Sequence, residues 1–115
     1  ITYGWGVHKA LEIIEQNQLK GRVVDLRTLL PWDQETVVAQ VKLTGKVLVL
    51  TEDTLTGSIA SDIAAWISEN CFEYLDAPVQ RLGSLDTPVP LAKSLEDHFL
   101  PWHRLRDTLD RLIAY

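Results

Sequence analysis

One short run of residues limits the fold of this chain more than any other feature. Lys46–Thr51 is an almost continuous apolar run, too short for a helix of ordinary length, and segments with helical spacing of apolar residues flank it. Continuous apolar strands occur where helices cover both faces of a parallel sheet. The run therefore predicts a buried strand in an α/β domain.

Three further short segments also predict strands. Ile1–Tyr3, Arg22–Leu26 and Val79–Leu82 are short apolar or β-branched runs, and each ends near a glycine or a proline. Because helical patterns separate these segments, the strands are expected to be parallel and joined by right-handed crossovers. The predicted helices span residues 5–17, 33–44, 59–70 and the end of the chain from Trp102. The proline-containing stretch Ser84–Pro101 is expected to be an ordered loop with one short turn.

Composition limits the domain count and the partners. With 115 residues, 46% of them hydrophobic, the chain can form one core but not two. A net charge of -5 without a basic stripe disfavours nucleic acid and membrane surfaces and favours a basic protein partner. The only cysteine, Cys71, cannot form an internal disulfide, which suits a reducing compartment. Because the sequence opens inside a predicted strand, we expect 1–115 to be one domain cut from a longer chain at its N-terminus.

Potential chemistry lies at the carboxyl ends of the predicted strands, where open α/β sheets bind ligands. Gly4–Gly6 is part of a dinucleotide-binding pattern, but Lys9 stands where its third glycine would be. Glu52 and Asp53 are paired carboxylates that could bind a cation or act as acid and base, yet no histidine or cysteine lies near them in sequence. We interpret the first as a plain turn and the second as caps and ion-pair partners that face another domain.

Two other residues are candidates for contacts with neighbouring domains. Arg27 lies at a predicted strand end beside Asp25, where either charge could pair with an adjoining domain. Trp32 places a large aromatic surface at the end of an element, where interface is as reasonable as core. No metal site is expected, because the three histidines have no metal-ligand spacing with one another or with Cys71.

Several motifs occur together in a fixed order that resembles one family. They are Asp25–Asp33, Thr44–Leu48, Glu52–Gly57, Cys71–Val79 and Asp86–Pro90. Over essentially its whole length the chain resembles the C-terminal domain shared by transketolases and the beta subunits of 2-oxo acid dehydrogenases. Pro31–Asp33, Cys71–Phe72 and Asp86–Pro88 are more similar to branched-chain 2-oxoisovalerate dehydrogenases than to pyruvate dehydrogenases.

The resemblance implies a three-layer α/β/α fold with a mostly parallel sheet, of which four strands in the order 2-1-3-4 belong to this chain. An antiparallel strand and the start of the next strand would precede Ile1. It implies a parent enzyme that decarboxylates a 2-oxo acid and transfers the acyl group to lipoyl. Thiamin diphosphate and magnesium would be held by modules outside this chain, so no catalytic, cofactor-binding or metal-binding residue carries over.

The resemblance also implies partners. They are the rest of the beta subunit, an alpha subunit, a second beta subunit and the peripheral binding domain of a dihydrolipoyl acyltransferase, in the cytoplasm of a bacterium or the mitochondrial matrix of a eukaryote. Asp76 and Tyr115 match the region that meets the binding domain. Three alternatives stay open: a pyruvate dehydrogenase beta subunit, an independent small-ligand or nucleotide-binding regulatory domain that uses Gly4–Gly6, and an enzyme that uses Glu52 and Asp53.

Overall fold

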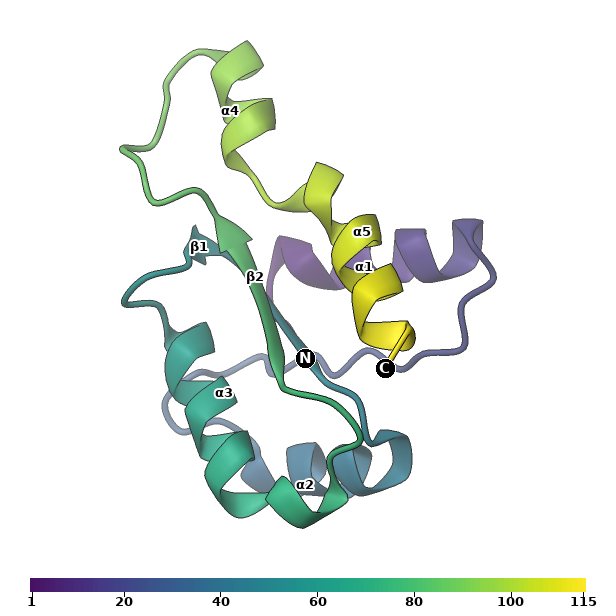
Figure 1. Ribbon diagram of the computed structural model, residues 1–115. Helices are drawn as coiled ribbons and strands as arrows, with labels where there is room; N and C mark the ends of the chain where they lie inside the picture. Colours follow the sequence, from purple (N-terminus) through teal and green to yellow (C-terminus); the bar gives the residue numbers. More distant parts are fainter.

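The computed structural model describes residues 1–115. Its elements in chain order are α1 (Trp5–Gln16), α2 (Gln34–Thr44), β1 (Leu48–Thr54), α3 (Ile59–Asn70), the short 3₁₀ helix η1 (Phe72–Tyr74), β2 (Gln80–Ser84), α4 (Lys93–Phe99) and α5 (Trp102–Ile113), as Figure 1 shows. None of these helices combines the length and the apolar character that a membrane span requires.

The sheet is smaller than the sequence predicts. β1 and β2 form a two-stranded parallel sheet, in which Leu50 pairs with Leu82. The prediction of four strands in the order 2-1-3-4 is therefore wrong, because Ile1–Tyr3 and Arg22–Leu26 are not strands. The α/β class and the parallel pairing are confirmed.

The two remaining segments pair over too few residues to form strands. Thr2 and Asp25 make a single isolated parallel bridge. Backbone hydrogen bonds join Thr2 to Val24 and Leu26 on one side and Ile1 to Leu48 and Leu50 on the other. Gly4, at a φ of 57°, leads into α1 directly afterwards, so the paired stretch is short.

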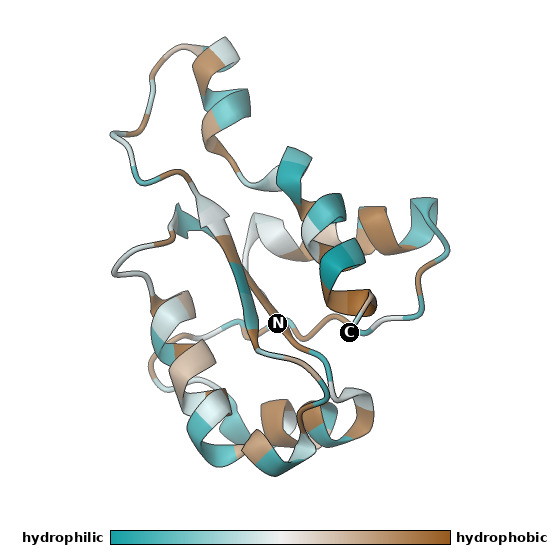
Figure 2. Ribbon diagram, viewed as in Figure 1, coloured by the Kyte–Doolittle hydropathy of each residue, from teal (hydrophilic) through white to brown (hydrophobic).

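Side chains of β1 enter two cores on opposite faces of the sheet. Val49 belongs to the larger core, which α2 and α3 complete, whereas Leu50 packs with Leu82 and with Leu105 of α5. Ile13 of α1 joins the smaller core. Helices therefore cover both faces, and the hydropathy colours of Figure 2 show apolar residues along β1 between them. This alternation follows from the two-residue period of a strand.

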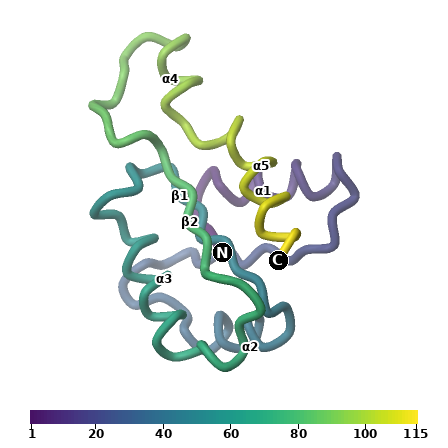
Figure 3. Tube along the Cα trace, in the orientation of Figure 1, coloured from purple at the N-terminus to yellow at the C-terminus, as the bar shows by residue number.

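The segment after β2 departs from its predicted form. Within the stretch expected to be a loop with one turn, Lys93–Phe99 forms the seven-residue helix α4. Phe99 is buried, and its carbonyl accepts a hydrogen bond from Leu85 N at 3.1 Å, which ties the helix back to the end of β2. Pro88, Pro90 and Pro101 lie around α4, and prolines favour the prediction of a loop over that of a helix of only two turns. Figure 3 shows this segment projecting from the rest of the chain.

Hydrogen-bonded carboxylates fix two turns of the fold. Asp33 caps α2, with Oδ1 accepting from Thr36 N at 2.9 Å and Oδ2 from Thr36 Oγ1 at 2.6 Å. Asp86 accepts from Thr56 N at 3.0 Å and Thr56 Oγ1 at 2.6 Å, and so joins the loops that follow β1 and β2. The hydrogen bonds from Thr36 and Thr56 lower the pKa of Asp33 and Asp86, respectively.

These lowered pKa values predict how stability depends on pH. Each carboxylate stabilises the fold above the pKa of an unfolded aspartate, about 3.9, and this contribution disappears as pH falls through the lower folded pKa. We expect Asp33→Ala with Asp86→Ala to lower the urea midpoint at pH 7 and to weaken its decline below pH 4. Glu73→Ala, at an exposed acid of η1, serves as the control. An acid decline as steep in the double variant as in the parent would contradict the prediction.

Candidate functional site

The carboxyl end of the sheet holds the acids that the sequence singled out, but they do not form a centre. Glu52 and Asp53 are exposed residues of β1. Asp53 Oδ1 accepts a hydrogen bond from Thr54 N at 2.8 Å, whereas no hydrogen bond or ion pair involves the Glu52 carboxylate. Arg27 forms an ion pair with Asp25, and its side chain is 84% exposed. Arg27, Glu52 and Asp53 are exposed and therefore accessible to another protein surface.

The glycine turn before α1 is shaped by packing. Gly4 has a φ of 57° and no atoms near its missing Cβ position. At Gly6 a Cβ would lie within 2.2 Å of Thr2 Oγ1, so a side chain of this chain already occupies that space. Trp5 is 56% exposed and flanks the turn. Gly6 is thus required by the contact with Thr2, which supports the interpretation of a plain turn.

At the amino end of the sheet, Asp76 and the end of the chain both lie near Gly45 and Lys46. Asp76 N donates to Gly45 O at 2.7 Å, and its carboxylate lies over Gly45, where a Cβ would be 2.1 Å from Oδ2. Lys46 Nζ donates to Ile113 O at 2.8 Å and holds the last turn of α5. Tyr115 is 67% exposed. Asp76 and the chain end are therefore candidates for one surface.

Trp32 lies beside α3 and is partly buried. Its ring packs edge-on against Trp66 of α3, with centroids 5.0 Å apart and planes at 87°. Both tryptophans pack against the larger core and remain partly exposed. The contact residues expected from the sequence thus fall in three places: Arg27, Glu52 and Asp53 at the carboxyl end of the sheet, Trp32 beside α3, and Asp76 and Tyr115 at the amino end.

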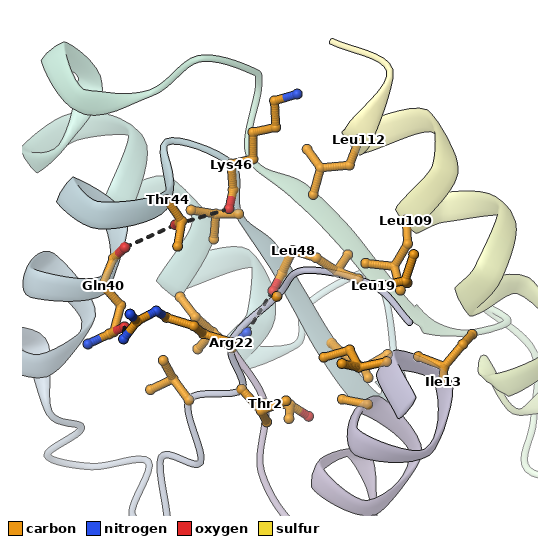
Figure 4. Close-up of a pocket in the computed structure, with 18 of the residues that line it drawn as sticks. Thr2, Ile13, Leu19, Arg22, Gln40, Thr44, Lys46, Leu48, Leu109 and Leu112 are labelled. Atoms are coloured by element: carbon orange, nitrogen blue, oxygen red, sulfur yellow. Dashed lines mark hydrogen bonds between the residues drawn. The ribbon is translucent and has the colours of Figure 1, made fainter. Parts of the chain in front are cut away.

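The structure also shows a pocket that the sequence did not reveal. It has a volume of about 230 Å³ and is lined mainly by apolar side chains from α1, α5, the start of β1 and residues 19–24. Figure 4 shows Arg22, Gln40, Thr44 and Lys46 along one side and Leu109 and Leu112 of α5 on the other. Its lining comes from six separate segments, so no local motif marks it.

A second, shallower hollow lies between β2 and α5, and the sequence did not reveal it either. Arg81, Arg104 and Arg111 contribute to its lining. Arg104 Nη2 donates to Gly83 O at 2.8 Å, and Arg81 Nη1 donates to Ser61 Oγ at 2.6 Å, so two of these arginines fasten helices to the edge strand. Arg104 Nε, in contrast, is buried and has no hydrogen-bond partner.

The titratable side chains do not assemble a metal centre. No group of three or more His, Cys, Asp or Glu side chains is arranged to hold a metal ion. Cys71 is fully buried, and burial raises the pKa of its thiol, which disfavours the thiolate.

The fold and the sites together define an α/β domain with helices on both faces of a parallel sheet and with exposed charged residues at both ends of it. The chain belongs to the transketolase C-terminal domain family, because the family model described as "Transketolase, C-terminal domain" matches residues 1–104.

Individual relatives are beta subunits of larger enzymes. The chain is 48% identical over 104 residues to the 2-oxoisovalerate dehydrogenase subunit beta of Bacillus subtilis. The aligned region covers 87% of this chain and 32% of that protein. The mitochondrial protein of the same name from Dictyostelium discoideum is 42% identical over 106 residues, with 87% and 28% covered. The pyruvate dehydrogenase E1 component subunit beta of Rickettsia bellii is 36% identical over 104 residues, with 88% and 32% covered. The chain spans about a third of the length of these relatives.

Proposed function

We propose that this chain is the C-terminal domain of the beta subunit of a branched-chain 2-oxo acid dehydrogenase, cut from a longer polypeptide. The 48% identity with a 2-oxoisovalerate dehydrogenase subunit beta over 104 residues carries this proposal. Relatives named for pyruvate dehydrogenase are 36–37% identical, which makes the pyruvate enzyme the alternative. The parent enzyme decarboxylates 2-oxoisovalerate-type acids, transfers the acyl group to lipoyl, and binds thiamin diphosphate and magnesium outside this chain.

An assay of the full-length beta subunit with its alpha subunit tests this proposal. The assembled enzyme is expected to decarboxylate 2-oxoisovalerate with a kcat/KM at least about tenfold above that for pyruvate, a difference of about 1.4 kcal/mol. Residues 1–115 alone are expected to turn over neither acid. A preference for pyruvate would assign the chain to a pyruvate dehydrogenase. Turnover by residues 1–115 alone would refute the proposal that catalysis requires the parts of the enzyme outside this chain.

Within this function, the domain serves assembly and docking. Its partners are the rest of its subunit, the alpha subunit, a second beta subunit and the peripheral binding domain of the dihydrolipoyl acyltransferase, in the cytoplasm or the mitochondrial matrix. Arg27, Trp32, Glu52 and Asp53 are proposed contacts within the enzyme, which their exposed or half-exposed side chains support. The net charge of -5 favours a basic partner.

Asp76 and Tyr115 are proposed to meet the acyltransferase binding domain. With the full-length enzyme, we expect Asp76→Lys to weaken binding by more than about 1 kcal/mol, and affinity to fall between roughly 50 and 200 mM salt, because charge pairs at an interface are screened. Calorimetry measures both effects. Deletion of Tyr115 tests the other half of the surface.

Asp97→Lys is the matched control for this experiment. It makes the same charge change on α4, at a side chain that is 62% exposed and far from the Gly45 turn in sequence. Unchanged affinity in both Asp76→Lys and the Tyr115 deletion would remove this surface from consideration. A loss confined to Asp97→Lys would move docking to α4.

A further inference from the structure

The hollow between β2 and α5 gathers positive charge in an acidic protein. Of the 11 lysines and arginines of the chain, three line this one hollow: Arg81 of β2, and Arg104 and Arg111 of α5. β2 and α5 pack against each other, as Figure 1 shows, so arginines that are distant in sequence share one surface. Because the net charge of the chain is -5, the hollow is a local reversal of its charge.

The three guanidinium groups of the hollow have no carboxylate partner. None of the four ion pairs of the fold involves any of them. Each donates a single hydrogen bond instead, to a neutral oxygen of Ser61, Gly83 or Thr108. A guanidinium carries five N–H donors, so most donors of these three groups are unused within the chain.

The two aspartates that also line the hollow do not neutralise this charge. Asp110 Oδ2 accepts a hydrogen bond from Arg106 Nε at 2.8 Å, and Arg106 is not part of the lining. Asp107 is exposed, and no hydrogen bond or ion pair involves its carboxylate. Three positive charges therefore face one free negative charge, and the local field attracts an anion.

The buried part of Arg104 is a second, independent observation. Gly83 O accepts from its Nη2 at 2.8 Å and fixes the guanidinium, whereas its Nε is buried without a partner. Burial of a charged group is costly unless hydrogen bonds or an opposite charge compensate for it. Buried polar atoms are nearly always satisfied in native proteins, so an unpaired one points to a missing partner such as an ion. An anion in the hollow supplies the opposite charge.

We propose that this hollow binds an organic phosphate, whose phosphoryl group pairs with Arg81, Arg104 and Arg111. Arginine forks match phosphate and carboxylate oxygens, and a phosphoryl group offers three terminal oxygens where a carboxylate offers two, which suits three arginines. The hollow has a volume of about 580 Å³, within the range of roughly 300–1,000 Å³ for small-molecule sites. Leu55 and Leu82 are its two hydrophobic lining residues and contact the organic part of the ligand.

Calorimetry on the full-length protein with phenyl phosphate as the probe tests this inference, which goes beyond the proposed function. Thiamin diphosphate and magnesium are kept at saturation, so that a site for that cofactor is already filled. Phenyl phosphate is expected to bind more tightly than inorganic phosphate, because its ring contacts Leu55 and Leu82. It is also expected to bind more tightly than benzoate at equal ionic strength, because benzoate has the same ring but one oxygen fewer.

Substitutions assign the binding to this hollow. Arg81→Gln together with Arg111→Gln is expected to raise the Kd for phenyl phosphate at least about tenfold, because two charged donors are lost. Arg22→Gln, at an exposed arginine outside the hollow, is the matched control and leaves the Kd unchanged. Asp107→Asn removes the free negative charge and is expected to lower the Kd about twofold. A gain of affinity cannot come from a loss of folding.

Three results would overturn the inference. A double arginine variant that binds phenyl phosphate as tightly as Arg22→Gln shows that the phosphate lies elsewhere. Benzoate binding as tight as that of phenyl phosphate shows that the hollow does not select a phosphoryl group. Tighter binding of a hexaglutamate peptide than of phenyl phosphate, lost in the double variant, would assign the hollow to an acidic protein segment.

Discussion

Ile63→Ala is expected to lower the free energy of unfolding by about 2–5 kcal/mol, because it removes buried methyl groups and leaves a cavity. Ile63 lies in α3, has no exposed surface, and belongs to the larger core on the α2 and α3 face of the sheet. Small α/β domains are stable by only about 5–15 kcal/mol, so this variant is expected to lie close to global unfolding. Urea denaturation followed by circular dichroism measures the change.

Ile113→Ala is the matched control for this prediction. It is the same substitution on the last turn of α5, where the side chain is 52% exposed. We expect it to cost less than about 1 kcal/mol, since little apolar area is returned to water. Equal losses in the two variants would mean that the core does not lie where α3 meets the sheet.

Gly83→Ala is expected to destabilise the fold by about 1–3 kcal/mol, through overpacking. A Cβ at Gly83 would lie 2.7 Å from the backbone oxygen of Asp53 and 3.3 Å from Leu55 Cα. Neither atom belongs to a flexible side chain, so β1 and β2 must separate to admit the methyl group. Gly83 lies within β2, where the pairing with β1 becomes irregular between Leu50 and Thr54. Thermal denaturation measures the loss.

Gly21→Ala provides the comparison at a glycine with room to spare. The nearest atom to its Cβ would be Ile14 Cδ1 at 3.5 Å, an ordinary contact. Because alanine restricts the unfolded chain, we expect this variant to be neutral or more stable by up to about 1 kcal/mol. If Gly83→Ala were as stable as Gly21→Ala, the close approach of the two strands would not exist in solution.

Much of the secondary structure was predictable from local pattern. The helices α1, α2, α3 and α5 begin and end within about two residues of their predicted bounds, a normal error for helix ends. α4 was not predicted as a helix, because proline-rich surroundings and a length of seven residues leave little periodicity to recognise.

The strands were harder to predict, because a strand is completed by a partner. The short apolar run at Ile1–Tyr3 has strand composition, yet only Thr2 makes a recognised bridge. Gly83 was expected to end the last strand, whereas it lies inside β2, because its missing side chain lets β1 approach. Composition records the preference of a residue and not the distance to a neighbouring backbone.

For the candidate site too, the sequence showed local features and the structure showed the long-range contacts. Local order showed that Glu52 and Asp53 are adjacent acids. It could not show that Asp76 lies over Gly45, or that Lys46 Nζ holds the last turn of α5 at 2.8 Å from Ile113 O. These contacts join residues that are distant in sequence, and the pocket beside residues 22–24 is likewise assembled from separate segments.

The sequence by itself determined the α/β class, the four longer helices and the family resemblance, because each depends on local periodicity, turn chemistry and the order of motifs along the chain. Only the tertiary structure decided that two strands pair, that Gly6 accommodates Thr2, and that a pocket lies behind the first residues. Hydrogen-bond partners and packing distances across long sequence separations exist only once the chain has folded.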